Sequence, residues 1–166
     1  MATVSIVMGS KSDLASLKGA FEILKDFGVS CEAHIISAHR TPDAASDFAK
    51  NAESNGVKVI ICAAGMAAHL AGVIAAHTTL PVIGIPMASA PFNGFDALLA
   101  MVQMPPGIPV ATVTAGSAGG KNAALLAIAM LALSDADLAV KLKEFRQKQT
   151  QKVVEDDLAL QQELGL

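Results

Sequence analysis

Five short, largely apolar runs recur along this chain of 166 residues, and a segment of helical periodicity follows each one. The runs cover residues 4–8, 31–37, 57–63, 81–86 and 109–114. Continuous rather than alternating apolar residues are typical of strands that are covered on both faces. Strands that alternate with helices are typical of a parallel sheet. The pattern therefore predicts an α/β fold in three layers, with an open, parallel, five-stranded sheet between helices.

The predicted helices lie between these runs and after the last one. They cover residues 14–28, 42–56, 67–77, 95–104 and 121–133, and a long polar helix follows from Asp135. The expected apolar contacts of that last helix are Leu138, Leu142, Phe145, Val153 and Val154. A chain of this length is usually one domain. We expect a single domain over residues 1–166, with a core to about 134 and a C-terminal helical extension over about 135–166.

Composition limits the classes of partner. Hydrophobic residues make up 52% of the chain and charged residues 16%, so we expect a homo-oligomer that buries apolar surface between subunits. The net charge of −3 does not favour nucleic acid. The longest apolar run, 123–133, is shorter than the roughly 20 residues that span a membrane. Without a signal-peptide pattern, and with Cys31 and Cys62 far apart, we expect a cytoplasmic protein with reduced cysteines.

A first polar cluster follows the first predicted strand, at residues 9–13, where the sequence is Gly-Ser-Lys-Ser-Asp. The amides at the start of a helix favour an anion such as phosphate, and Ser10 and Ser12 can add hydroxyl hydrogen bonds. Asp13 repels phosphate, so it suits a ribose hydroxyl better. The alternative is an ordinary helix cap built from Ser10 and Asp13.

A second cluster, at residues 37–42, follows the second predicted strand with the sequence Ser-Ala-His-Arg-Thr-Pro. Arg40 can hold a phosphate or carboxylate with two parallel hydrogen bonds. His39 can exchange a proton near neutral pH. The alternative for His39 is a structural histidine that caps the next helix.

Two further loops are rich in small residues. Residues 63–69 end the third predicted strand and let a ligand approach the backbone, with His69 in the first turn of the next helix. Residues 116–122 form a Gly-rich turn that can also contact an anion, although they lack the Lys-Ser/Thr ending of a P-loop. The alternative for residues 63–69 is a loop whose small residues serve packing of the helix on the sheet.

Ligands of open parallel sheets bind beyond the carboxyl ends of the strands. The candidate loops begin at Gly9, Ser37, Ala64, Met87 and Ala115. The sequence shows no Gly-x-Ser-x-Gly elbow and no set of residues with metal-ligand spacing. An anion site beside a histidine therefore favours chemistry on a phosphorylated small molecule.

Several separated motifs resemble the class I PurE family of purine synthesis, the N5-carboxyaminoimidazole ribonucleotide mutases. The resemblance runs from the first strand to the apolar helix. The motifs are residues 8–13, 37–42, 67–70, 103–113 and 122–127. Two positions beside His69 depart from the common pattern, because Met66 stands where many members have Gly and Ala71 where many have Pro.

The resemblance implies a flavodoxin-like domain, a homo-octamer, and no metal or organic cofactor. It implies that His39 is the catalytic acid-base. Ribonucleotide binding would fall to Ser10, Ser12, Asp13, Ser37, Ala38 and Arg40. The end of the site that holds carboxylate and carbon dioxide would be formed by Gly65, Ala67, His69 and Leu70.

The implied reaction moves a carboxylate from a ring-attached nitrogen to C4 of an aminoimidazole ribonucleotide, by loss and recapture of carbon dioxide. One alternative is a direct carboxylase that uses dissolved carbon dioxide. Such proteins commonly have His-Lys-Thr where this chain has His39, Arg40 and Thr41, which favours the mutase. A non-catalytic flavin- or nucleotide-binding module is disfavoured, because the chain has no Trp or Tyr to stack on a flavin. A scaffold protein would not explain the polar clusters at strand ends.

Overall fold

The structure is a computed structural model that describes residues 2–165. The described residues form two compact units that divide between Ala127 and Ile128. The first unit contains the sheet and the second contains the long C-terminal helix. The single-domain organisation stays a prediction.

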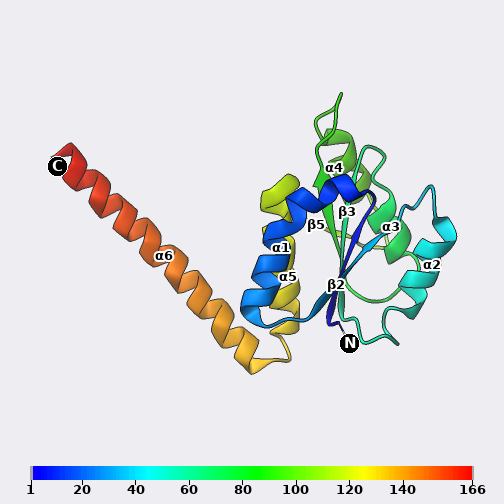
Figure 1. Cartoon of the computed structure of the whole chain (residues 1–166), viewed down its shortest axis with the longest axis horizontal. Coiled ribbons are helices and arrows are strands. Elements are labelled where there is room, and N and C mark those ends of the chain that lie inside the picture. The colour runs from blue at the N-terminus through cyan, green and yellow to red at the C-terminus, as the bar shows by residue number, and fades with distance from the viewer. Residues whose placement is uncertain (1, 166) are drawn as a thin grey trace. The chain divides into compact units, whose positions relative to one another are not determined.

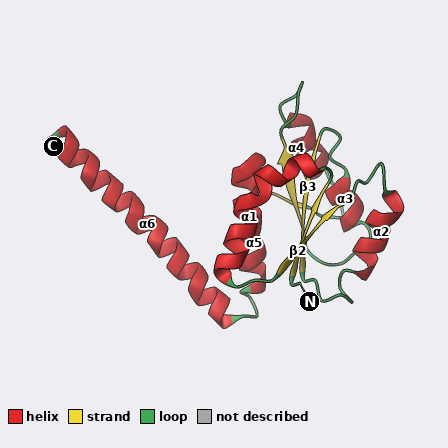
Figure 2. Cartoon of the chain, viewed as in Figure 1, coloured by secondary structure: helices red, strands yellow, loops and turns green. Residues whose placement is uncertain are grey.

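The sheet has five parallel strands in the order β2-β1-β3-β4-β5. They are β1 (Val4–Met8), β2 (Cys31–Ile35), β3 (Val59–Gly65), β4 (Val82–Met87) and β5 (Ala111–Thr112). Every residue of β1 and β4 is buried, as expected for strands that are covered on both faces. Figure 2 shows the strands between helices. The predicted three-layer α/β fold with an open five-stranded parallel sheet is confirmed.

Helices cover both faces of this sheet. They are α1 (Leu14–Phe27), α2 (Pro42–Asn51), α3 (Leu70–Ala75), α4 (Phe95–Val102) and α5 (Gly116–Leu131). A short 3-10 turn, η1 (Lys11–Asp13), leads into α1. In Figure 1, α1 and α5 lie on one side of the sheet, and α2 and α3 lie on the other. On the second side, Ala45 of α2, Ile74 of α3 and Met101 of α4 pack into one core with Ile60 of β3.

Helix α5 begins five residues earlier than the sequence predicts, and its glycines explain why. A Cβ atom at Gly120 would lie 2.7 Å from the carbonyl oxygen of Ser16 in α1. A Cβ atom at Gly119 would overlap the carbonyl oxygen of Thr114. Gly119 and Gly120 therefore let α5 approach its neighbours closely, and none of residues 116–122 lines the cavity described below.

Several other elements are shorter than predicted. Strand β5 has two residues instead of six, because its pairing with β4 is limited to Ile83–Ala111 and Gly84–Thr112. Pro109 has no backbone N–H to extend that ladder. Strand β2 ends at Ile35, two residues before its predicted end, so the polar cluster that begins at Ser37 is free to form a loop.

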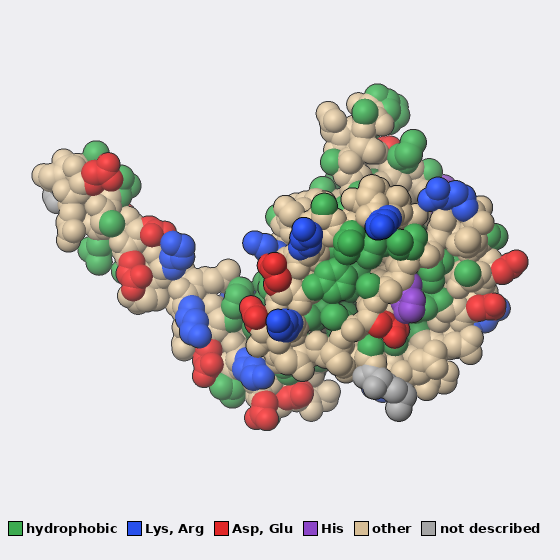
Figure 3. Space-filling model, in the orientation of Figure 1, with side chains coloured by type: hydrophobic (Ala, Val, Ile, Leu, Met, Phe, Trp, Pro, Cys, Tyr) green, Lys and Arg blue, Asp and Glu red, His purple; other side chains and the backbone are tan. Residues whose placement is uncertain are grey.

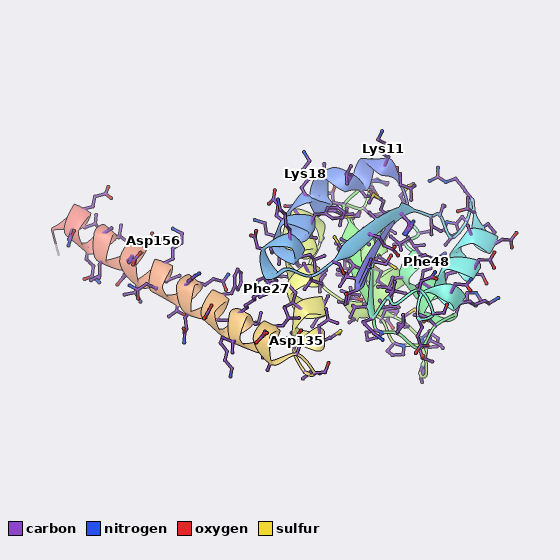
Figure 4. All side chains as sticks on the ribbon, turned by 60° about the horizontal axis from the view of Figure 1, so that its bottom comes forward. Lys11, Lys18, Phe27, Phe48, Asp135 and Asp156 are labelled. Atoms are coloured by element: carbon purple, nitrogen blue, oxygen red, sulfur yellow. The ribbon has the colours of Figure 1, made fainter. Side chains whose placement is uncertain are left out.

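The C-terminal helix, α6 (Ala136–Leu164), begins where the sequence predicts. Asp135, labelled in Figure 4, caps it by accepting a hydrogen bond of 3.0 Å from the backbone N–H of Leu138. None of the helix residues is buried, and Val153 is 67% exposed. Val154 is 48% exposed, and the apolar contacts that the sequence predicts for these two residues stay a prediction. None of the helices in residues 2–165 has the length and apolar character needed to cross a bilayer.

Candidate active site

A cavity of about 620 Å³ lies beyond the carboxyl ends of β1, β2, β3 and β4. Four of the five candidate loops line it, and the loop that begins at Ala115 does not. The lining residues are Gly9, Ser10, Ser12, Asp13, Ser37, Ala38, His39, Arg40, Ala64, Gly65, Met66, Ala67, His69, Leu70, Met87, Ala88 and Ser89. All eleven residues that the sequence predicts for the site are among them. Their individual roles stay predictions.

The loop after β1 is held by a capping box. The backbone N–H of Ser10 donates to Oδ2 of Asp13 at 3.1 Å, and Oγ of Ser10 accepts from the backbone N–H of Ser12 at 3.3 Å. The helix-cap interpretation of this cluster is thus correct as local geometry. It does not exclude ligand binding, because the same loop lines the cavity.

Asp13 lies partly buried in this loop. Burial raises the pKa of its carboxyl group above the ordinary value of 3.8, and hydrogen bonds from the Ser10 backbone and the Ser12 side chain partly offset that rise. The folded state therefore binds this proton more tightly than the unfolded state does. The stability that Asp13 contributes is complete below pH 3.8 and is lost as the pH rises through the raised value.

Asp13→Asn is therefore expected to raise the free energy of unfolding at neutral pH. An amide oxygen can still accept the hydrogen bond from Ser10, while the buried charge is gone. The gain should shrink as the pH falls toward 3.8, where the wild-type carboxyl is protonated. Urea unfolding across this pH range measures the gain at neutral pH and its decrease toward pH 3.8. A stability difference that does not change with pH would contradict the assignment to burial of the charge.

The loop after β2 is closed by Thr41 and Ser37. The backbone N–H of Ser37 donates to Oγ1 of Thr41 at 2.9 Å, and that hydroxyl donates to the Ser37 carbonyl at 3.0 Å. Pro42 then occupies the first turn of α2. His39 makes no capping contact with α2, whose N-cap is Thr41. The capping interpretation of His39 is therefore wrong, and its ring lies at the cavity instead.

Arg40 joins the loops after β1 and β2. Its Nη2 atom donates to the carbonyl of Gly9 at 3.0 Å, and its Nε atom lies 3.4 Å from Oγ of Ser37. These contacts hold the guanidinium at the edge of the cavity. Arg40 is the only Lys or Arg among the residues that line the cavity. An anionic group of a ligand is therefore drawn to this end.

His39 and His69 meet across the cavity, although 30 positions separate them in the sequence. Nε2 of His39 lies 2.9 Å from Nδ1 of His69, and the rings are nearly perpendicular, at 81°. At that distance the two nitrogens share one N–H, so one ring donates and the other accepts. The pair can hold a proton at the cavity and exchange it with a ligand.

The loop after β3 approaches the backbone of β4 closely. A Cβ atom at Gly65 would lie 3.0 Å from the Met87 carbonyl, so this position favours glycine. Met66 has a left-handed backbone with φ of 56° and is 62% exposed at the cavity. Glycine adopts a left-handed backbone without strain, which agrees with the glycine that the family resemblance implies at this position. Ala71 is fully buried in α3 and does not line the cavity, so of the two unusual positions only Met66 shapes the site.

Six lining residues lie outside the predicted eleven: Gly9, Ala64 and Met66 stand in or beside the loops that carry predicted residues, and the other three come from the segment after β4. Met87, Ala88 and Ser89 line the cavity. The start of this loop was a candidate because β4 ends there, but none of its residues has a motif that singles it out. No group of three or more His, Cys, Asp or Glu within residues 2–165 is arranged to hold a metal ion. The arrangement can bind an anion at Arg40 and transfer a proton at the histidine pair.

Comparison with known families identifies similar sequences. A family model described as AIR carboxylase matches residues 3–152. An N5-carboxyaminoimidazole ribonucleotide mutase of Escherichia coli K12 is 51% identical over 155 residues, which cover 93% of this chain and 92% of that protein. A mutase of the same name from Saccharolobus solfataricus is 53% identical over 145 residues, 87% of this chain and 90% of that protein.

The comparison with solved structures agrees with the comparison of sequences. The crystal structure of Treponema denticola PurE superposes with a TM-score of 0.85 at 34% identity, covering 95% of this chain and 97% of that one. The fold and the order of its elements are therefore shared with an experimental structure over nearly the full length.

Proposed function

Because the chain belongs to the AIR carboxylase family, we propose that its cavity is the active site in which a carboxylate migrates on an aminoimidazole ribonucleotide. The activity is that of an N5-carboxyaminoimidazole ribonucleotide mutase, an isomerase of de novo purine biosynthesis. The observation that carries this function is the identity of about half of all residues with these mutases over nearly the full length. The histidine pair and the single arginine at one cavity agree with it.

The reaction proceeds in two steps that conserve every atom. The bond between N5 and the carboxylate carbon breaks, carbon dioxide is released into the cavity, and N5 keeps the electron pair and takes a proton. C4 of the ring then attacks carbon dioxide, and the tetrahedral C4 loses its proton to restore the aromatic ring. One group that first donates a proton and then accepts one serves both steps.

His39 suits this role because its ring lies at the cavity and contacts His69. The protonated ring gives its proton to N5 in the first step and takes the C4 proton in the second. His69 holds the ring through the 2.9 Å contact and keeps its orientation. Arg40 and the loop of residues 9–13 bind the phosphate, and Asp13 accepts a hydrogen bond from the ribose. Gly65, Ala67 and Leu70 leave room for carbon dioxide and exclude water.

A direct carboxylase is the second candidate, because it acts on the same ring. Assays of the purified protein with each substrate separately distinguish the two. We expect rapid conversion of N5-carboxyaminoimidazole ribonucleotide to the 4-carboxy isomer. We expect slow carboxylation of aminoimidazole ribonucleotide in bicarbonate buffer. Preference for the second reaction would contradict the mutase assignment.

We also propose that the chain assembles as a homo-octamer. Large apolar side chains are exposed along α6, and Figure 3 shows hydrophobic side chains among the charged ones on that helix. The most exposed are Val140, Val153, Val154, Leu158, Leu160 and Leu164. Exposed apolar surface of this kind is typical of subunit contacts. Light scattering should give about eight times the chain mass of 17.0 kDa, and a monomer at micromolar concentration would contradict the assembly.

A cytoplasmic location is part of the same proposal. Cys31 and Cys62 are both free, as is usual in reducing compartments. Burial raises the pKa of the Cys62 thiol far above its ordinary value, so this thiol stays protonated and unreactive. Fractionation of the source cells tests the location, and recovery of the protein in a secreted fraction would contradict it.

A further inference from the structure

Ser89 carries a hydroxyl group that the proposed chemistry has not used. The residue lies in the segment after β4 and lines the cavity. Its Oγ atom is shielded from solvent and has no hydrogen-bond partner among the described residues. A buried hydroxyl without a partner carries a free-energy cost in the folded state. Such groups are few in native structures and each calls for an explanation, which for Ser89 the adjoining cavity offers.

The sheet places Ser89 at a particular end of the cavity. Strand β4 pairs with β3, and Met87 is in register with Gly65. The segment after β4 therefore runs beside the loop that carries Met66 and His69. The loop of residues 9–13 follows β1, and Arg40 lies in the loop after β2. Both strands are on the other side of β3 from β4. The order of the strands thus puts Ser89 at the end of the cavity opposite Arg40.

The substrate has two anionic groups, a phosphate and the migrating carboxylate. Arg40 is the only cationic Lys or Arg side chain that lines the cavity, and it suits the phosphate. No Lys or Arg is then left for the carboxylate, so apart from the His39 ring that acts on N5 it meets neutral donors at the end formed by β3 and β4. Neutral donors suit a carboxylate that must leave as carbon dioxide, because an ion pair would stabilise the ground state more than the transition state.

We propose that the hydroxyl of Ser89 binds the migrating carboxylate. The hydroxyl reaches the ligand by rotation about χ1 from its buried position to another staggered position. This rotation breaks no hydrogen bond, because the hydroxyl makes none where it lies. The assignment rests on the proposed mutase function and adds a binding residue to it.

Ser89→Ala tests the assignment with two independent measurements. Removal of an unpartnered hydroxyl is expected to raise Tm. The same change is expected to weaken binding of 4-carboxy-5-aminoimidazole ribonucleotide about tenfold, as loss of one hydrogen bond to a charged group does. Binding of aminoimidazole ribonucleotide, which lacks the carboxylate, should not change. Calorimetric titration of both ligands gives this comparison.

Ser5→Ala is the matched control. Ser5 is fully buried in β1, its Oγ atom also lacks a partner among the described residues, and it does not line the cavity. The Ser5→Ala variant should raise Tm in the same way, and its affinities for the carboxylated and the uncarboxylated ribonucleotide should both stay unchanged. Equal weakening of both ligands by Ser89→Ala, or unchanged affinity for the carboxylated one, would overturn the proposal. If the wild-type protein fails to interconvert the two carboxylated ribonucleotides, the proposed function itself is contradicted.

Discussion

His39→Asn is expected to lower kcat by about 10²–10⁴-fold, the usual contribution of a positioned acid-base. Asparagine is close in size to the imidazole ring and can keep a polar contact with His69, but it cannot take up and release a proton. The affinity for the ribonucleotide should stay close to the wild-type value, because Arg40 and the loop of residues 9–13 are untouched. Steady-state turnover and equilibrium binding of the product measure the two effects separately.

His77→Asn is the matched control for this change. His77 is exposed after the end of α3 and does not line the cavity, so turnover should be normal. Turnover of the His39 variant within a few-fold of wild type would remove His39 from the proton transfer. A parallel loss of affinity would instead indicate that the variant disturbs the binding loop.

Arg40→Ala is expected to weaken ribonucleotide binding about 10- to 100-fold, the range for loss of hydrogen bonds to a charged group. This side chain is the only Lys or Arg among the lining residues. Its removal also frees the Gly9 carbonyl, which Nη2 contacts at 3.0 Å. The effect should appear in KM and in Kd, with a smaller change in kcat, because no proton transfer is assigned to Arg40.

Two further variants separate charge from geometry at this position. Arg40→Lys keeps the charge but cannot reach Gly9 and Ser37 together, so we expect an intermediate loss of affinity. Lys50→Ala removes one positive charge from the exposed surface of α2, outside the cavity, and should leave affinity unchanged. Equal losses from Arg40→Ala and Lys50→Ala would show that general charge, and not the site, governs binding.

Local patterns predict most of the fold. The apolar runs place β1 and β4 to within one residue, because each strand buries both faces and so requires consecutive apolar side chains. The ends of elements are predicted less well. The start of α5 depends on the fit of Gly120 against Ser16. The length of β5 depends on how many of its residues pair with β4. These contacts join residues that are distant in the sequence.

In the candidate site, too, local sequence patterns decide some features and contacts between distant residues decide others. By itself, the sequence determines which strand ends carry hydroxyls, an arginine and histidines, because strands, helices and their connecting loops are encoded by local patterns. Only the tertiary structure decides that His39 and His69 lie 2.9 Å apart, that Arg40 binds the Gly9 carbonyl, and that Ser89 joins the cavity. The physical reason is the order of the strands, which is set by packing over the whole sheet and brings separate loops to one edge.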